Sequence, residues 1–245
     1  MKRKLTILFL CLTGLTYGQS FEGTLTYKTD FEVAEKMIKM GMTKEKLITS
    51  MKQEGTYSDT TKISYKQGNY YTIQNSKPKS WTIYKADVGK IYTMQDGESK
   101  DICTVLDATI DLEYTMTGKM PSVLKLDTTF LNNNSTCYIV SVKWKSGTYD
   151  YYYDPTKLTV KPALFEKHTY DGWAEFLNIS NSLPFKIVKT TKGIMTVTMT
   201  LVSTKTETIN DKIFTIPNLI PDKNLNIIKT ANREYMRIKK VNKTK

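Results

Sequence analysis

The feature that most limits the fold is a run of short segments, between residues 57 and 106, in which apolar and polar side chains alternate. An alternation with a period of two is typical of strands with one buried face. Turn sequences such as Gln67-Gly68 and Asp96-Gly97 separate the segments, and tight turns of this kind join antiparallel neighbours. The sequence therefore predicts a meander of antiparallel strands at residues 62–66, 69–75, 80–85, 90–95 and 101–106.

The same alternation recurs on both sides of this run, at residues 19–29, 136–143, 148–154, 183–190 and 194–205. Residues 107–117 are less regular and are interpreted as a further strand. Trp173, Phe176 and Leu177 have helical spacing instead. A sheet with one apolar face must cover that face with another layer. We therefore expect a mainly β fold, a large curved antiparallel sheet or half-barrel with helices packed in its concave face.

Residues 31–53 are the longest stretch with helical periodicity, and they hold four of the eleven methionines. Gly41 is expected to break this stretch into two short helices, and Thr43 can cap the second. The flexible thioether of methionine adapts to ligands of varied shape. The helices are predicted to lie on the concave face, where they either cover a ligand cavity or fill the space as core. The residues proposed for an apolar ligand cavity are Met37, Ile38, Met40, Leu47, Ile48 and Met51.

The N-terminus has the pattern of a secretory signal peptide, with a basic start, a short apolar run and a small residue at Gly18. The apolar run is well short of the ~20 residues that a spanning helix needs. We therefore expect cleavage after residue 18 and export as a soluble periplasmic or extracellular protein. No shift in composition divides the remainder, so residues 19–230 are expected to form one domain and residues 231–245 a basic tail.

Export bears on the cysteines, because disulfides persist in oxidising compartments. After removal of Cys11 with the signal peptide, Cys103 and Cys137 remain. An even pair in an exported chain predicts a disulfide between them. The alternative is two separate buried thiols.

The formal net charge is +12, or +9 without the three basic residues of the signal peptide. This balance favours anionic partners such as lipid headgroups or acidic glycans. Nucleic acid is not expected as a partner after export. We expect lipid or lipoprotein acyl chains, or a protein of the cell envelope, as partners.

Residue patterns for catalysis or metal binding are not apparent in the sequence. His168 is the only histidine, and nothing in its surroundings indicates a nucleophile or an orienting acid, so a surface position is expected. Asp111 and Glu113 would share a face of the expected strand, as pairs on solvated sheets often do. We expect a protein that is not an enzyme and that has no metal and no cofactor.

Three segments carry a resemblance to a known family: FEGTLTYK at 21–28, SLPFKIVKTTKGI at 182–194 and DKIFTIP at 211–217. Together with the signal peptide, they resemble the bacterial outer-membrane lipoprotein-sorting carriers (LolA, LolB and the LppX-like group). The resemblance implies a half-barrel whose helices line an apolar cavity for acyl chains. The Met-rich insertion after the first strand departs from these carriers, and no residue with a defined binding role maps onto this chain.

Two functions follow from the sequence. The first is a periplasmic carrier or sensor that binds a lipid or another apolar ligand under the Met-rich helices. The second is a secreted β-rich interaction or structural module with no small-molecule ligand, in which the methionines and tyrosines are core. Binding of a fluorescent fatty acid separates the two.

Overall fold

The computed structural model describes residues 20–132, 135–222, 225 and 230–239. The expected signal peptide at residues 1–18 lies outside the described residues, as do residues 240–245 of the expected tail. Within the described residues, no helix combines the length and the apolar composition needed to cross a membrane.

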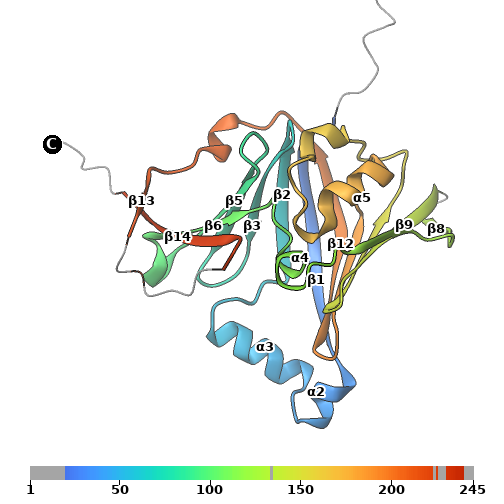
Figure 1. Ribbon diagram of the computed structural model, residues 1–245, viewed down its shortest axis with the longest axis horizontal. Helices are drawn as coiled ribbons and strands as arrows, with labels where there is room; N and C mark the ends of the chain where they lie inside the picture. The colour runs from blue at the N-terminus through green and yellow to red at the C-terminus, as the bar shows by residue number, and fades with distance from the viewer. Residues whose placement is uncertain (1–19, 133–134, 223–224, 226–229, 240–245) are drawn as a thin grey trace, which may run out of the picture.

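An open antiparallel sheet makes up most of the described chain (Figure 1), as predicted. The hairpins of the expected meander are neighbours in the sheet, and the first strand pairs with both β2 and β12. β8 (Phe130–Asn132) pairs with β9 beside the main path. Along that path the strands are β13 (Leu219–Pro221), β14 (Arg233–Ile238), β6 (Ile102–Asp107), β5 (Lys90–Gln95), β4 (Ser80–Lys85), β3 (Asn69–Gln74), β2 (Thr60–Lys66), β1 (Gly23–Val33), β12 (Met195–Thr206), β11 (Lys186–Thr191), β10 (Gly147–Tyr153), β9 (Ser135–Lys143) and β7 (Ser122–Lys125).

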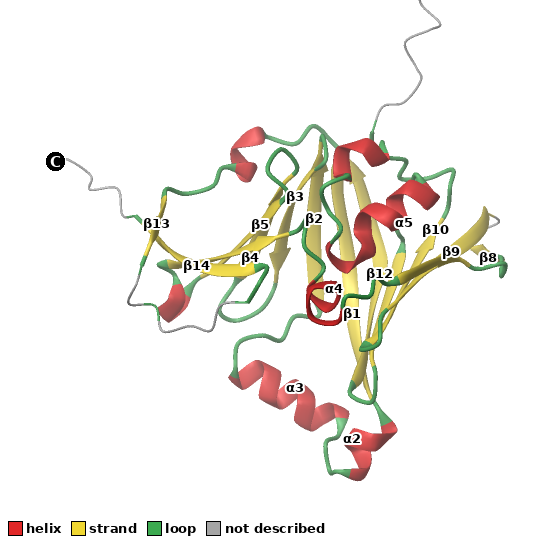
Figure 2. Cartoon of the chain, in the orientation of Figure 1, coloured by secondary structure: helices red, strands yellow, loops and turns green. Residues whose placement is uncertain are grey.

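Short helices interrupt the strands (Figure 2). The α-helices of the described chain are α2 (Glu35–Lys39), α3 (Lys44–Gln53), α4 (Leu112–Thr117) and α5 (Trp173–Ser180). Single 3-10 turns are η2 (Gly97–Ser99), η3 (Pro162–Phe165), η4 (Tyr170–Gly172) and η5 (Asp211–Phe214). The predicted break in the Met-rich stretch is confirmed, because Gly41 separates α2 from α3 with a φ of 84°. Thr43 caps α3 by accepting a hydrogen bond from the backbone N–H of Lys46 at 3.3 Å.

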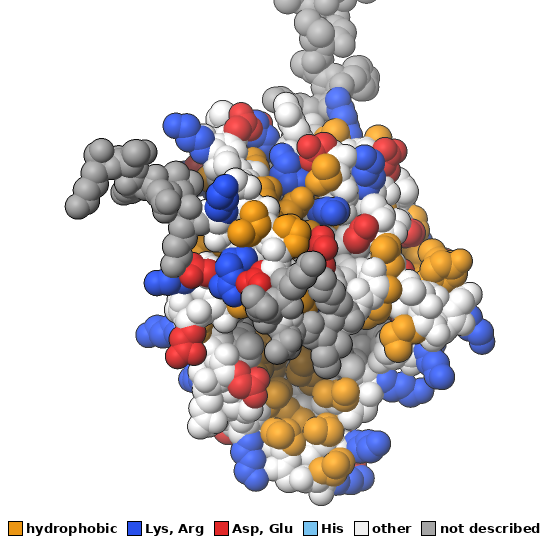
Figure 3. All heavy atoms as spheres, turned by 60° about the vertical axis from the view of Figure 1, so that its left-hand side comes forward, with side chains coloured by type: hydrophobic (Ala, Val, Ile, Leu, Met, Phe, Trp, Pro, Cys, Tyr) orange, Lys and Arg blue, Asp and Glu red, His pale blue; other side chains and the backbone are white. Residues whose placement is uncertain are grey.

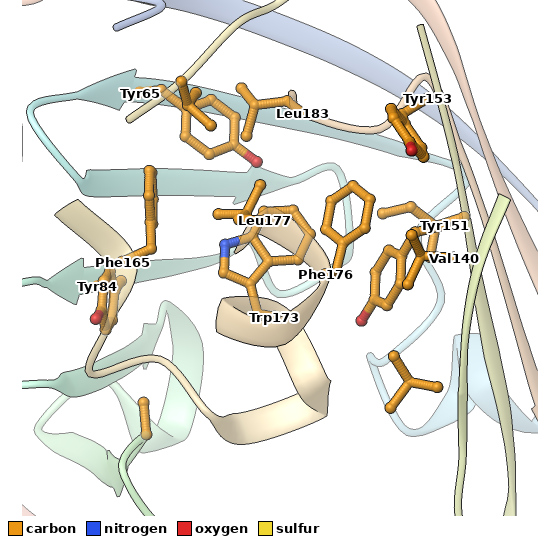
Figure 4. Close-up of a cluster of buried hydrophobic side chains, with 14 of the residues drawn as sticks. Tyr65, Tyr84, Val140, Tyr151, Tyr153, Phe165, Trp173, Phe176, Leu177 and Leu183 are labelled. Atoms are coloured by element: carbon orange, nitrogen blue, oxygen red, sulfur yellow. The ribbon is translucent and has the colours of Figure 1, made fainter. Parts of the chain in front are cut away.

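The sheet curves around α5, which packs in its concave face. Tyr84 on β4 and Val140 on β9 belong to one buried cluster although they come from opposite wings of the sheet. Phe176 of α5 is fully buried in that cluster and stacks on Tyr151 of β10, with ring centroids 4.5 Å apart. Figure 4 shows Trp173, Phe176 and Leu177 of this helix pointing among the aromatic side chains of the strands. The helical spacing seen in the sequence therefore marks the layer that covers the concave face.

A second, smaller cluster covers the opposite face of β4–β6. Ile83 belongs to it, whereas its neighbour Tyr84 belongs to the first cluster, as alternation along a strand requires. Ile209 and Phe214, from the segment that contains η5, pack against this face. Residues 213–217 thus cover the convex face of β4–β6.

Three expectations about elements need correction. Residues 112–117 form α4 rather than a strand, with Asp111 as its N-cap. Residues 233–238 form β14, paired with β6, rather than part of a basic tail. The Met-rich helices α2 and α3 lie beyond the end of β1, at the lower end in Figure 1, and not in the concave face. The physical reason for this last difference is that residues 31–33, expected as part of the helical stretch, continue β1. This strand stays paired with β12 as far as Val33, so the chain has reached the end of the sheet before α2 begins.

The predicted disulfide between Cys103 and Cys137 is not formed. Each residue is a buried thiol, and the two lie on β6 and β9 with eight strands between them in the sheet. The Cys137 thiol faces the backbone oxygen of Ser135 at 3.5 Å. A bridge requires Cα atoms within about 7 Å, which this separation does not permit. The alternative of two separate buried thiols is correct.

Candidate ligand-binding site

A cavity of about 350 Å³ lies in the part of the concave face that α5 leaves uncovered. Its walls come from β1, β2, β3, β11 and β12, and residues of the η4–α5 region close it from the other side. Met51 and Thr56, at and after the end of α3, flank it. Its lining residues are Thr29, Phe31, Met51, Thr56, Ser58, Thr61, Ile63, Tyr65, Tyr70, Thr72, Gln74, Tyr151, His168, Asp171, Trp173, Ile187, Lys189, Val197 and Met199. We call this space the concave cavity.

The strand residues of the concave cavity occupy alternate positions. Thr29 and Phe31 continue the face on which Leu25 and Tyr27 are buried beneath α5. Alternate residues of a strand point to the same side of a sheet, so the core face of β1 becomes the cavity wall where the helix ends. The wall therefore mixes aliphatic and thioether side chains with threonine hydroxyls.

An ion pair stands in this wall. The Nζ of Lys189 on β11 lies 2.7 Å from Oδ2 of Asp171 in η4, and both side chains are largely shielded from solvent. Burial opposes protonation of Lys189, but the charge and hydrogen bond of Asp171, together with Tyr149 and Tyr170, outweigh it and raise the pKa of the lysine above its ordinary value. The same carboxylate raises the pKa of Tyr170 to about 12. The cavity thus contains one fixed dipole with a positive and a negative end.

Unusual backbone geometry holds Asp171 in place. Its φ of 62° lies in the left-handed region, as does that of Gly172 at 66°. A Cβ on Gly172 would lie 2.5 Å from Cγ1 of Val142, so only glycine fits there without movement. The hydroxyl of Tyr151 donates a hydrogen bond of 2.7 Å to the backbone oxygen of Asp171. Such over-determined backbone conformations cluster at functional sites.

His168 is buried beside the cavity, which corrects the expected surface position. Nε2 lies 2.9 Å from the hydroxyl of Tyr70, and Nδ1 lies 3.2 Å from the backbone oxygen of Tyr170. We assign the neutral tautomer from these partners, with Nδ1–H donating to the carbonyl and Nε2 accepting from the phenol. Burial lowers the pKa of this imidazole to about 4. His168 therefore connects β3 to η4 through two hydrogen bonds while its imidazole is uncharged.

A larger groove of about 680 Å³ adjoins the concave cavity, and Asp171 lines both. α4, the β9–β10 turn and the end of β11 form its other walls. Asp111 accepts a hydrogen bond from Nε1 of Trp144 at 2.8 Å, and Glu113 accepts one from the backbone N–H of Lys145 at 2.5 Å. These two hydrogen bonds connect α4 to the β9–β10 turn. The sequence predicts the two carboxylates on one face of a strand, which the structure corrects. No group of three or more potential metal ligands comes together in the described residues.

Of the six residues proposed for the ligand cavity, the structure brings Met51 to it. Met37, Leu47 and Ile48 are half-buried on α2 and α3 without lining the cavity. Ile38 and Met40 are exposed on the outer side of this region. Sequence reasoning missed the main lining residues, although the alternation of β1, β2 and β12 marks the face on which they lie.

Comparisons with known proteins add little. No family model matches the chain, and no curated protein is similar to it. Among solved structures, PNGF-II in a P21 crystal form is similar with a TM-score of 0.43 and 9% identity, over 80% of this chain and 30% of the PNGF-II chain. PNGF-II in a C2 form has a TM-score of 0.32 and 11% identity over the same shares. The chain thus spans about 30% of the length of these proteins, and both scores are too low to indicate a shared fold.

Proposed function

We propose that this protein is an exported binding protein, a carrier or sensor, that holds a lipid or another apolar ligand in the concave cavity. The observation that carries the proposal is the cavity of about 350 Å³ among the side chains of the central strands. Sites for small molecules have volumes of about 300–1,000 Å³ and mainly apolar walls with a few polar groups. Phe31, Ile63 and Val197 provide such apolar walls, and Lys189 and Asp171 provide polar groups.

The polar groups favour an amphipathic ligand. A protonated lysine has three N–H donors, and Asp171 occupies one of those of Lys189. The remaining donors can meet a carboxylate, phosphate or hydroxyl group on a ligand whose apolar part lies against the aliphatic wall. The threonine hydroxyls on β1 and β2 offer further hydrogen bonds. Binding rather than catalysis is proposed, since Asp111, Glu113 and His168 already have structural partners.

Export to the periplasm or cell exterior belongs to the same proposal. It rests on the N-terminal sequence pattern. Mass spectrometry of the protein secreted from its host would test it, because cleavage after Gly18 predicts a mature chain that begins at Gln19. A chain that retains Met1 in the cytoplasm would contradict this part of the proposal.

The binding proposal predicts that a large side chain at Val197 abolishes ligand binding. Val197 of β12 lines the cavity, so Val197→Trp would fill the space that the ligand needs. We expect the affinity for a fluorescent fatty acid to fall at least tenfold, measured by titration. Each buried methylene contributes about 0.8 kcal/mol. Shortening the acyl chain by two methylenes should therefore weaken binding to the wild type by roughly 15-fold, provided that both methylenes are buried.

The matched control is Thr198→Trp. Thr198 follows Val197 in the same strand and points to the opposite face of the sheet. This variant should bind the probe as the wild type does, and circular dichroism should report the same fold for all three proteins. A wild type that binds no fatty acid, or two tryptophan variants that bind equally well, would leave the structural-module function as the better account.

A further inference from the structure

The Met-rich helices form an exposed surface, most of which lies outside the concave cavity. We define the helical tip as residues 35–54, which contain α2 and α3, together with the β11–β12 turn at residues 192–194. The turn adjoins the helices, because the backbone N–H of Ala34 donates a 2.9 Å hydrogen bond to the oxygen of Ile194. Neither α2 nor α3 has a buried residue. The two helices therefore contribute little to the core and present most of their surface to the exterior.

Apolar side chains project from the helical tip. Met40 is 70% exposed, Ile38 52% and Ile194 48%. Figure 3 shows hydrophobic side chains gathered at the lower end of the molecule, where α2 and α3 lie, with basic side chains on either side of them. The helical tip contains no aromatic residue, whereas aromatic side chains are enriched in protein–protein interfaces.

The charge of the helical tip is positive. It contains six lysines and three glutamates. Lys39 pairs with Glu35, and Lys44 pairs with Asp30 of β1. Within the described part of the chain, four more lysines of the tip form no ion pair with a carboxylate: Lys36, Lys46, Lys52 and Lys192. Of these four, Lys46 donates a hydrogen bond to the backbone oxygen of Gly41, and Nζ of Lys52 lies over the ring of Tyr57. Lysines without a carboxylate partner around exposed aliphatic side chains are typical of segments that lie at the surface of an anionic membrane.

The tip is also continuous with the cavity. Met51, in the last turn of α3, lines the concave cavity, and so does Thr56 just after that helix. Phe31, at the end of β1 that leads into α2, lines it as well. A surface in contact with the helical tip would therefore lie next to the space in which we propose that the ligand is held.

We propose that the helical tip is a docking surface for a lipid bilayer with anionic headgroups, from which the cavity takes up or to which it delivers its ligand. This inference rests on the proposed binding function and names the partner surface. Ile38, Met40 and Ile194 enter the headgroup region, while the four lysines contact anionic lipids. Each lysine near such a surface strengthens binding by about fivefold. Because exposed charges are screened by salt, docking weakens as ionic strength rises.

The experiment is flotation of the full mature protein with vesicles, either of phosphatidylcholine alone or of equal parts phosphatidylcholine and phosphatidylglycerol. The wild type is expected to float with the anionic vesicles at low salt and to bind the neutral vesicles at least tenfold less. The double variant Ile38→Asp, Met40→Asp should lose vesicle binding. The control is Val88→Asp, at a residue in the β4–β5 turn that is 49% exposed. It should bind vesicles as the wild type does.

Fatty-acid titration without vesicles separates the two proposals. The Ile38→Asp, Met40→Asp variant should keep the wild-type affinity for the fluorescent fatty acid, because neither residue lines the cavity. A wild type that binds the fatty acid but floats with neither kind of vesicle overturns the docking proposal alone, and the tip would then suit a protein partner. Vesicle binding that Val88→Asp weakens as much as the tip variant also overturns it. A wild type that binds no fatty acid overturns the proposed function instead.

Discussion

Replacing Phe176 with alanine is expected to lower the free energy of unfolding by about 3–5 kcal/mol, the usual effect of removing a fully buried aromatic ring. Phe176 stacks on Tyr151, makes an edge contact with Tyr153 at a centroid distance of 6.0 Å, and lies tilted against Trp173 at 5.5 Å. It is the centre of the contact between α5 and the concave face. Urea-induced unfolding, followed by circular dichroism, measures the change.

The control for this prediction is Asn178→Ala. Asn178 is exposed on the same helix, and surface substitutions usually change stability by no more than about 0.5 kcal/mol. Comparable losses in the two variants would mean that α5 is not packed in the sheet as described. Because Trp173 of the same helix lines the concave cavity, Phe176→Ala should also weaken fatty-acid binding, whereas Asn178→Ala should not.

The second large effect is a loss of stability at acid pH that depends on His168. Burial, the main cause, lowers the pKa of His168 to about 4, although the nearby Asp171 carboxylate acts in the opposite direction and Lys189 acts with burial. In the unfolded chain the pKa is about 6.5. The unfolded state therefore binds a proton more readily, so the free energy of unfolding falls as the pH drops from about 6.5 to about 4. The loss over this window is roughly 3 kcal/mol.

Urea unfolding at pH 7 and pH 4 tests this prediction when the wild type is compared with His168→Gln. The variant is expected to be less stable at pH 7, because the hydrogen bonds with Tyr70 and the Tyr170 carbonyl are disturbed. Its stability should then fall by roughly 3 kcal/mol less than that of the wild type on acidification. Carboxylates titrate in both proteins, so their contribution cancels in the difference. Equal losses in the two proteins would show that His168 does not become harder to protonate on folding.

Much of the fold can be predicted from the sequence because its signals are local. The hairpin strands β3, β4 and β5 are predicted within a residue of their ends, since alternating side chains and turn residues define them. The break at Gly41 and the cap at Thr43 are equally local. By contrast, α4 is only six residues long and too short for a periodic pattern. Its cap residues, Asp111 and Gly118, were the available signal.

Features that depend on distant parts of the chain could not be predicted. The basic composition after residue 230 suggested a tail, yet Met236 and Ile238 of β14 pack on the convex-face cluster through pairing with β6. A disulfide between Cys103 and Cys137 is reasonable from an even count, but sheet order keeps them apart. The concave cavity exists because α5 covers only part of the concave face. The alternation within a strand does not indicate how far a helix that is distant in the sequence extends over the sheet.

The most direct test of the account is photo-crosslinking with a fatty acid that carries a diazirine on its acyl chain, followed by peptide mapping. Binding in the concave cavity predicts adducts on peptides that contain lining residues such as Phe31, Met51 and Met199, and their loss in Val197→Trp but not in Thr198→Trp. Adducts confined to Ile38 and Met40, or spread over the convex face and unchanged by Val197→Trp, would contradict binding in the concave cavity.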